Sequence, residues 1–172
     1  MITIRHERAA DAAAREALLD AAFGAARDRK SSQRLRDGRL PAAGLSFVAT
    51  ERGRIVGTAR LWEIAFGGKP ALLLGPVAVA ADRRGRGIGS TLVQRAIDEA
   101  RKRGHGAIVL VGDAPYYGRF GFSTAKVGRL RLPGPFERHR LLGLELIAGA
   151  LDGAGGFMRA TGRLMHQPAA AA

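Results

Sequence analysis

Leu72 to Ser90 read LLLGPVAVAADRRGRGIGS and form the most informative segment of the chain. An almost unbroken apolar run, too short to span a membrane, is followed by a short polar turn and then by glycines at alternate positions. A helical pattern begins directly after these glycines. Alternate glycines let the backbone approach a ligand, and the first amides of a helix point outward, where the helix dipole favours an anion. This combination predicts a buried strand that leads into a phosphate-binding loop.

The length and composition predict one globular domain. The chain has 172 residues, of which 47% are hydrophobic and 25% are charged, and such a chain can bury a sizeable core. It contains no Cys, which excludes disulfides, thiolate metal sites and a Cys nucleophile. Neither a signal peptide nor an apolar run of the ~18 residues that a membrane span needs is visible. We expect a single domain over residues 1–160, a frayed tail over 161–172, a cytoplasmic location and no membrane partner.

The formal net charge of +13 raises the question of a nucleic-acid partner, because clustered cations release counterions from a phosphate backbone. The cations are nearly all Arg, however, and they are scattered rather than interleaved with aromatic residues. The chain is also rich in Ala and Gly, a composition typical of global codon bias. A solvated basic surface is therefore favoured over nucleic-acid binding, and a basic groove that attracts an anionic cofactor or substrate is compatible with it.

The segments around the loop predict a mixed sheet with flanking helices. Strands are predicted at residues 2–6, 45–50, 55–66, 71–80, 107–112, 141–147 and 155–159, and longer helices at residues 11–23 and 88–103. Short turns join the segments between residues 45 and 80, so these strands must pair antiparallel. A helix joins 71–80 to 107–112, and this crossover makes the two strands parallel. The fold class is α/β (α+β), with a mixed central sheet of about seven strands, antiparallel in its first half.

The glycine loop matches neither of two common nucleotide-binding motifs. A nucleoside-triphosphate P-loop needs Lys before Ser90, where Gly89 stands. A dinucleotide fingerprint needs G-x-G-x-x-G after an N-terminal strand, whereas here the spacing is G-x-G-x-G and several elements precede it. Taken alone, the loop leaves a purely structural role open.

A second motif follows the helix and makes the pattern specific. Val77-x-Val79 and the R-x-x-G-x-G pattern of residues 84–89, together with GDAPYYGRFGF at residues 112–122, resemble the Gcn5-related N-acetyltransferases, the GNAT superfamily. The resemblance covers about residues 2–160 and is closest to the bacterial YhbS-like acetyltransferases, in which a GD-x-x-YY-x-RFGF segment is typical. It implies the GNAT fold, in which two parallel strands splay apart, and an acyltransferase that uses acetyl-CoA as acyl donor and no metal.

The resemblance assigns the acetyl-CoA site to the glycine loop and to the strands beside it. The implied cofactor-binding residues are Val77, Ala78, Val79, Arg84, Gly85, Arg86, Gly87, Ile88, Gly89, Ser90 and Tyr117. The amides from Arg84 to Ser90 would hold the pyrophosphate, and the backbone from Val77 to Val79 would pair with the pantetheine arm as an added strand does. The Val79 amide would donate to the acetyl carbonyl and stabilise negative charge on its oxygen.

Tyr117 is the catalytic residue that the resemblance implies, and Glu63 is a candidate for a second one. Tyr117 stands where the family usually keeps a tyrosine that protonates the leaving thiolate, and a phenol with a pKa near ~10 is a reasonable donor. The alternative is that Tyr117 only packs against CoA. Attack by a neutral amine also needs a proton acceptor, and the strand at residues 71–80 contains no acid. Glu63, on the preceding strand, and Glu51, in a turn, are the candidates, although a solvated carboxylate is the more common role for each.

The predicted function is direct transfer of an acetyl group to a primary amine of a small molecule or peptide. No covalent enzyme intermediate is required, which suits a chain without Cys. The alternative is an acyl-CoA-binding sensor or interaction module with weak or no catalysis, because the sequence identifies no base. The resemblance places the acceptor site at residues 23–44 and 128–160; the Arg residues of the first segment favour an acidic acceptor or simply form a solvated face. A homodimer through the late strands is compatible with the pattern.

Overall fold

The computed structural model describes residues 1–165 of the chain. Its strands are β1 (Ile2–His6), β2 (Ser46–Glu51), β3 (Arg54–Phe66), β4 (Lys69–Leu74), β5 (Ala78–Val79), β6 (Ala107–Val111), β7 (Leu130–Arg131), β8 (Leu141–Glu145), β9 (Gly156–Phe157) and β10 (Arg159–Ala160). Its α-helices are α1 (Ala12–Phe23), α2 (Ile88–Lys102) and α3 (Ala114–Gly118), and its 3-10 helices are η1 (Ala9–Asp11), η2 (Ala25–Arg29), η3 (Ser31–Leu35), η4 (Ala81–Arg83) and η5 (Arg138–Arg140).

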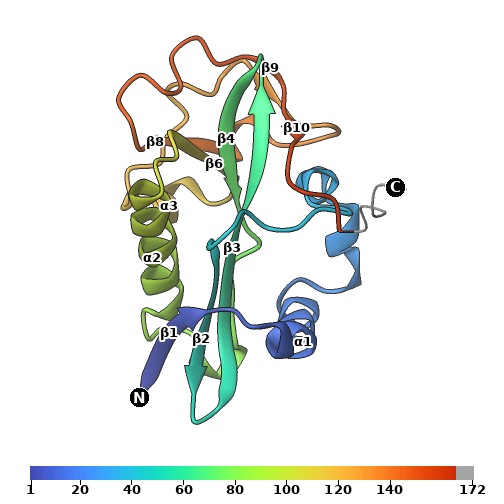
Figure 1. Ribbon diagram of the computed structural model, residues 1–172, viewed down its shortest axis with the longest axis vertical. Coiled ribbons are helices and arrows are strands. Elements are labelled where there is room, and N and C mark those ends of the chain that lie inside the picture. Colours follow the sequence, from blue (N-terminus) through green and yellow to red (C-terminus); the bar gives the residue numbers. More distant parts are fainter. Residues whose placement is uncertain (166–172) are drawn as a thin grey trace, which may run out of the picture.

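The main sheet is mixed and has eight strands, where about seven were predicted. Its order is β1-β2-β3-β4-β6-β8, and β5 and β10 pair with β3; β7 and β9 form a separate pair. The long strand β3 runs through the middle of the molecule and joins the two halves of the sheet (Figure 1). Strands β2, β3 and β4 are antiparallel, while β4 and β6 are parallel. The predicted meander and the predicted parallel pair are both confirmed.

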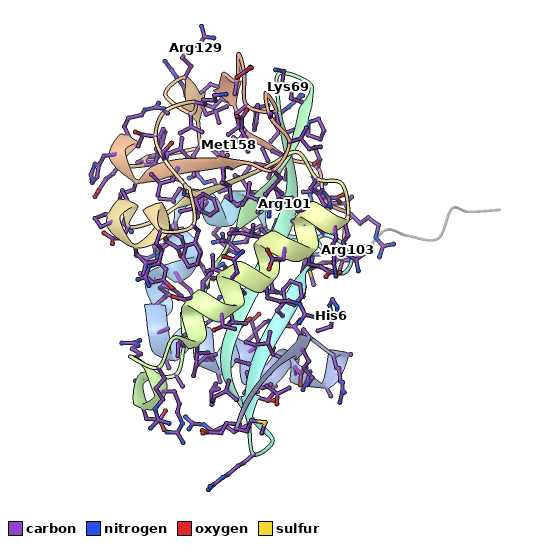
Figure 2. The ribbon with its side chains drawn as sticks, turned by 90° about the vertical axis from the view of Figure 1, so that its left-hand side faces the viewer. His6, Lys69, Arg101, Arg103, Arg129 and Met158 are labelled. Carbon is purple, nitrogen blue, oxygen red and sulfur yellow. The ribbon has the colours of Figure 1, made fainter. Side chains whose placement is uncertain are left out.

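Helix α2 packs across one face of this sheet (Figure 2). Its buried residues are those that the helical spacing predicts: Ile88, Leu92, Val93, Ala96, Ile97 and Ala100. A Cβ on Gly57 of β3 would lie 2.8 Å from Leu92 Cδ1, a distance that real Cβ atoms do not adopt. The close contact between helix and strand therefore requires glycine at this position, and it fixes the start of α2 over the centre of the sheet.

The opposite face of the sheet is also buried. Trp62 and Ile64 of β3 pack there against apolar residues from the segments that follow β6, among them Val127 and Leu130. Helix α1 lies on the other side of the sheet from α2 (Figure 1). Because β3 is covered on both faces, its sequence shows no alternation of polar and apolar residues.

The strand predicted at residues 71–80 is interrupted, so that prediction needs a correction. β4 ends at Leu74 and β5 begins at Ala78, with a cis Gly75-Pro76 peptide bond between them. Pro76 has no amide proton and cannot continue a ladder. The Gly75 amide donates to the carbonyl of Arg60 (2.9 Å), and the Trp62 indole donates to the carbonyl of Gly75 (2.7 Å). These two hydrogen bonds hold the break against β3.

The last described residues run beside the segment 38–40. The Leu40 amide donates to the carbonyl of Arg163 (2.7 Å), and the Met165 amide donates to that of Gly38 (2.9 Å). The first residues of the segment that we expected to fray are therefore hydrogen-bonded, while residues 166–172 lie outside the described residues. The domain boundary at residue 160 stays a prediction. In the described part of the chain no helix is long and apolar enough to cross a membrane.

Candidate active site

Strands β4 and β6 diverge at the carboxyl end of β4. They pair only through Leu72 with Ile108 and Leu73 with Val109. Beyond Leu74 the backbone bends at Gly75, and β5 pairs with β3 instead of with β6. The result is a gap between β5 and the end of β6, which agrees with the splayed parallel pair that the resemblance implies.

The backbone of β5 presents hydrogen-bonding groups to this gap. Ala78 pairs with Thr58 of β3, and the Ala80 amide donates to the carbonyl of Val56 (2.9 Å). Successive backbone groups of a strand point to opposite sides. The amides of Val77 and Val79 therefore point away from β3 and into the gap, where an extended ligand can pair with them.

The loop between η4 and α2 has a row of amides without partners. Gly85 and Gly87 have φ values of +81° and +76°, and α2 begins at Ile88. Within residues 1–165 the amides from Arg84 to Ser90 donate no hydrogen bond, and the exposed side chains of Arg84 and Arg86 make none either. Open amides at the start of a fifteen-residue helix, with two cations beside them, fit a pyrophosphate.

Helix α3 braces the start of α2. Asp113 caps α3 by accepting a hydrogen bond from the Tyr116 amide (3.1 Å). The Tyr116 hydroxyl and Ser90 Oγ lie 3.3 Å apart. The guanidinium of Arg119 lies 4.3 Å from the centre of the Tyr116 ring, and its Nη1 lies 3.3 Å from Ser90 Oγ. Arg119 thus adds a third cation near the loop; sequence reasoning quoted it within the motif without giving it a role.

Tyr117 lies at the end of β6, facing the gap. A Cβ on Gly112 would lie 2.6 Å from Tyr117 Cε2, so glycine is needed for the ring to pack there. The ring also packs edge-on against Phe122, with centroids 5.9 Å apart. Burial raises the pKa of Tyr117 to about 12, because the charged phenolate loses its solvation.

A cavity of about 640 Å³ opens from the gap toward the α1 side of the sheet. Val77 and Tyr117 both line it, so the structure brings these two predicted site residues together. Its other walls come from residues 23–36, which follow α1, and from residues 132–140. Both regions in which the acceptor site was expected therefore contribute to one cavity.

The structure does not bring Glu63 to this cavity. Glu63 pairs with Leu72 in the middle of the sheet and shares the α2-covered face with Leu61. Burial lowers the pKa of His105, and the charge of Glu63 opposes that shift; His105 precedes β6, at the end opposite to the gap. Glu51 is the last residue of β2 and pairs with Arg54, and a hydrogen bond from Arg83 holds the pKa of Glu51 below its usual value.

The carboxylates that line the cavity are Asp113 and Glu137. Asp113 is occupied as the cap of α3. Glu137 is mostly exposed, and its Oε2 lies 3.4 Å from Nε2 of His139. Sequence reasoning missed Glu137, because it lies in an irregular segment with no motif around it.

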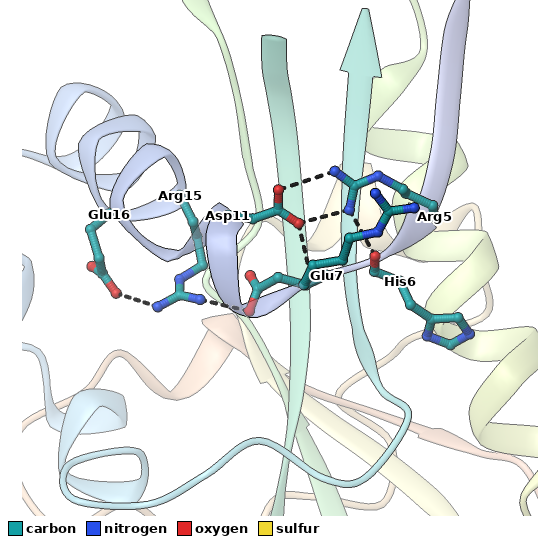
Figure 3. A network of polar contacts seen from close by, with 7 residues as sticks. Arg5, His6, Glu7, Asp11, Arg15 and Glu16 are labelled. Carbon is teal, nitrogen blue, oxygen red and sulfur yellow. Dashed lines mark hydrogen bonds and ion pairs between the residues drawn. The ribbon is translucent and has the colours of Figure 1, made fainter. Parts of the chain in front are cut away.

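Ion pairs attach one wall of the cavity to α1. Arg15 on α1 contacts Glu7 (2.6 Å) and Glu16 (3.0 Å), as Figure 3 shows. Glu16 also accepts a hydrogen bond from Arg27, which in turn contacts Asp20. This chain of charges fixes η2, the start of the 23–36 wall, to the helix.

The start of α1 is held by a second ion pair in the same view (Figure 3). Asp11 accepts hydrogen bonds from Arg5 (2.7 Å) and from the Arg8 amide (2.7 Å). The hydrogen bond from Arg5, followed by that from the Arg8 amide, lowers the pKa of Asp11 to about 2. The ionised carboxylate is therefore the form that stabilises this end of the helix.

The mixed sheet and the gap between β5 and β6 are those of the GNAT acetyltransferases, and the comparison with known families gives the same class. Residues 12–122 match the acetyltransferase (GNAT) family, and this chain belongs to that family as an N-acetyltransferase. It is 33% identical over 146 residues to the uncharacterized N-acetyltransferase YhbS of Escherichia coli, with 80% of this chain and 86% of that protein covered. The uncharacterized N-acetyltransferase YjhQ of the same organism is 29% identical over 126 residues, 69% of each chain.

Solved structures show the same relationship. The crystal structure of YhbS from Escherichia coli in complex with CoA superposes with a TM-score of 0.78 at 30% identity, covering 93% of this chain and 89% of that one. A GNAT family acetyltransferase from Brucella melitensis in complex with acetyl-CoA gives a TM-score of 0.62 at 30% identity, with 88% and 99% covered. The family and fold predicted from the sequence are confirmed.

Proposed function

We propose that the protein transfers an acetyl group from acetyl-CoA to a primary amine of a small molecule or peptide. The observation that carries this proposal is two sets of backbone amides without partners among residues 1–165, one at Val77 and Val79 beside the gap and one from Arg84 to Ser90 in the loop. The ligands of the two related structures, CoA and acetyl-CoA, support it further. Bound there, acetyl-CoA would supply the thioester whose acyl group is transferred.

The residues of this chain fit that ligand in three places. The loop amides and the cations Arg84 and Arg86 suit a pyrophosphate. The amides of Val77 and Val79 suit the amides of an extended pantetheine arm. In addition, the Val79 amide would stabilise negative charge on an acyl oxygen in the gap.

Tyr117 would act at the sulfur of the leaving group. With a pKa of about 12, its phenol stays protonated at neutral pH and is a weaker acid than a thiol, whose pKa is near ~8.5. Complete proton transfer to a free thiolate is therefore uphill, whereas a hydrogen bond to a sulfur that gains negative charge is favourable. We therefore assign to Tyr117 the role of a hydrogen-bond donor that keeps its proton at the departing sulfur.

The geometry favours Glu137 over Glu63 as the group that accepts the amine proton, directly or through water. Glu137 lines the same cavity as Tyr117, and Glu63 does not. A base must reach the proton that it removes, so location decides before pKa does.

Calorimetry and a thiol-release assay test the proposal on the full chain. We expect acetyl-CoA to bind in the micromolar range and CoA thiol to appear when amines are added. Absence of binding at millimolar acetyl-CoA would contradict the proposal. The cytoplasmic location and the homodimer stay predictions, and size-exclusion chromatography with light scattering checks the second.

A second candidate, an acyl-CoA-binding sensor with weak or no catalysis, is favoured by one observation. Neither carboxylate that the sequence suggested as a base, Glu63 or Glu51, lines the cavity. Binding of acetyl-CoA without turnover on any member of a broad amine panel would select this candidate over the enzyme.

A further inference from the structure

Three cations line the cavity without a carboxylate partner. Within residues 1–165, Lys30, Arg36 and Arg140 form no ion pair, whereas Arg27 on the same wall is neutralised by Glu16 and Asp20. Lys30 comes from the segment after α1, Arg36 from the end of η3 and Arg140 from η5. Segments about a hundred residues apart thus direct uncompensated positive charge into one space.

Arg36 is the most buried member of this set. It is only 7% exposed, and its guanidinium contacts neutral oxygens alone: Nε donates to Gln33 Oε1 (3.0 Å), and Nη2 lies 3.5 Å from Ser32 Oγ. Burial lowers the pKa of Arg36 to about 10, and the like charge of Arg60 adds to the shift while Asp37 opposes it. A buried guanidinium is costly without an anion beside it.

Arg36 and Arg140 both act on Lys30, and Arg140 also acts on the reacting end of the cavity. The pKa of Lys30 is lowered by burial and then by the charges of Arg36 and Arg140. The charge of Arg140 also acts on Tyr117 and partly offsets the rise of its pKa. The positive cluster therefore extends from the buried Arg36 to the neighbourhood of the Tyr117 phenol.

The phosphates of the acyl donor do not account for these charges. The loop Arg84 to Ser90, which suits a pyrophosphate, lines no part of this cavity. The carboxylates within the lining do not neutralise the cluster either: Asp113 caps α3, and neither Asp113 nor Glu137 forms an ion pair with Lys30, Arg36 or Arg140 within residues 1–165. The charges of Lys30, Arg36 and Arg140 are therefore available to an anion that enters the cavity from the α1 side.

We propose that the acceptor is an amine that also carries an anionic group, a carboxylate or a phosphate, and that Lys30, Arg36 and Arg140 bind this group while the amine faces the gap. The inference rests on the proposed transfer function and specifies the substrate class of the same site. A charge-assisted hydrogen bond to a buried guanidinium is strong and directional, so the anionic group both adds affinity and orients the amine.

Matched pairs of amines test the inference in the full chain. The probes are ω-amino carboxylates of increasing length, each beside its amide, and O-phosphoethanolamine beside ethanolamine. Their affinities are measured by calorimetry on the protein saturated with CoA, and kcat/KM is measured by thiol release with acetyl-CoA. We expect the anionic member of at least one pair to be favoured by about tenfold to hundredfold, the range for one charged hydrogen bond.

Variants distinguish the effect of the three cations on selectivity from that of the general positive charge of the protein. Arg36→Gln should remove the preference for the anionic member and leave the Kd for acetyl-CoA within about twofold. Arg29→Gln is the matched control, because Arg29 is exposed on η2 and lies outside the cavity lining; it should keep the preference. Should Arg36→Gln fail to fold, Lys30→Met and Arg140→Gln replace it, since both residues are more exposed than Arg36.

The outcomes distinguish the inference from the function on which it rests. Absence of acetyl-CoA binding would overturn the proposed function, and the inference with it. Acetyl-CoA binding with equal affinity and turnover for both members of every pair would overturn the inference alone. A preference that Arg29→Gln removes as fully as Arg36→Gln would also overturn it, because the general charge of the surface would then explain the selectivity.

Discussion

The two sides of the gap differ in the atoms that they present. The loop side, residues 77–90, offers the amides of Val77 and Val79 and those from Arg84 to Ser90, which donate to no other group of the described chain. The cavity side, residues 23–36 and 132–140, offers charged side chains carried by 3-10 helices and irregular segments. Backbone amides bind chemical groups that all ligands of one class share. Side chains distinguish one ligand of that class from another.

The two sides of the gap therefore place different requirements on the sequence. The loop side needs small residues and a fixed backbone path, which few sequences can provide. The cavity side needs only that a given charge reach a given point, and many sequences meet that requirement. A change on the loop side should therefore abolish activity on every substrate, while a change on the cavity side should alter which substrate is used.

The largest effect is expected at Gly87. Gly87→Glu places a side chain at a φ of +76° and a negative charge among the amides that suit the pyrophosphate, so we expect acetyl-CoA affinity to fall by roughly a hundredfold or more. Calorimetry measures it. Gly53→Glu is the matched control: Gly53 has the same φ and the same open surroundings in the turn before β3, and it should bind acetyl-CoA normally. Equal losses in both variants would contradict a specific role of the loop.

Tyr117→Phe is expected to lower kcat by about ten- to hundredfold, the range for one hydrogen bond to an atom that gains charge, and to leave the acetyl-CoA Kd unchanged. Tyr116→Phe is the control, because that hydroxyl contacts Ser90 rather than the cavity. Unchanged turnover in Tyr117→Phe would reduce this residue to a packing role against the cofactor.

The raised pKa of Tyr117 also predicts a pH profile. The phenol must be protonated to donate, so its contribution is lost only as the pH rises through about 12. Between pH 7 and about 10 Tyr117 should cause no decline in kcat, whereas a phenol with the ordinary value of ~10 would have lost half its contribution by then. An alkaline decline near pH 10 that disappears in Tyr117→Phe would argue against the shift.

Glu137→Gln should reduce kcat/KM by about tenfold at neutral pH and less at high pH, where the amine loses its proton unaided. Glu63→Gln is the comparison, and we expect it to remain within about twofold of the unmodified protein. Thiol release between pH 7 and 9.5 measures both. A larger loss of kcat/KM in Glu63→Gln than in Glu137→Gln would restore Glu63 as the base. The proton acceptor would then lie outside the cavity.

The smallest effect concerns the stability of the start of α1, the helix to which one wall of the cavity is attached. Asp11→Asn should lower the free energy of unfolding by about 1–2 kcal/mol at pH 7. Because the folded pKa of Asp11 is about 2, below the ordinary 3.8, the stabilisation is present above about pH 4 and is lost as the pH falls toward 2. Urea unfolding at pH 7 and pH 2.5 checks this. Asp82→Asn, at an exposed pair with Arg54, is the control and should change little.

The sequence predicted the loop side well for a local reason. The strand, the glycine loop and α2 are contiguous, so apolar runs, glycine spacing and helical periodicity describe them without long-range information. The one local error was the continuous strand at residues 71–80. The apolar residues on both sides of Gly75-Pro76 concealed a break that depends on hydrogen bonds from Trp62 and to Arg60, residues of another strand.

The cavity side could not be predicted from local patterns. Lys30, Arg36 and Arg140 meet only after folding, and each alone is indistinguishable from the many scattered Arg and Lys residues of a chain with a net charge of +13. That Glu63 does not line the cavity could not be predicted for a related reason. Both faces of β3 are buried, so no alternation in its sequence shows which side chains point toward the cavity.

The hydrogen bond from the Trp62 indole to Gly75 has a practical consequence. Trp62 is the single tryptophan of the chain; it is 5% exposed, and the guanidinium of Arg60 lies 4.7 Å from its ring. The tryptophan fluorescence of the unlabelled protein therefore originates at one indole, which is hydrogen-bonded to the carbonyl at which β4 turns away from β6. Trp62 is thus an intrinsic fluorescent probe beside the gap, and stopped-flow measurement of its emission can follow the binding of a ligand there.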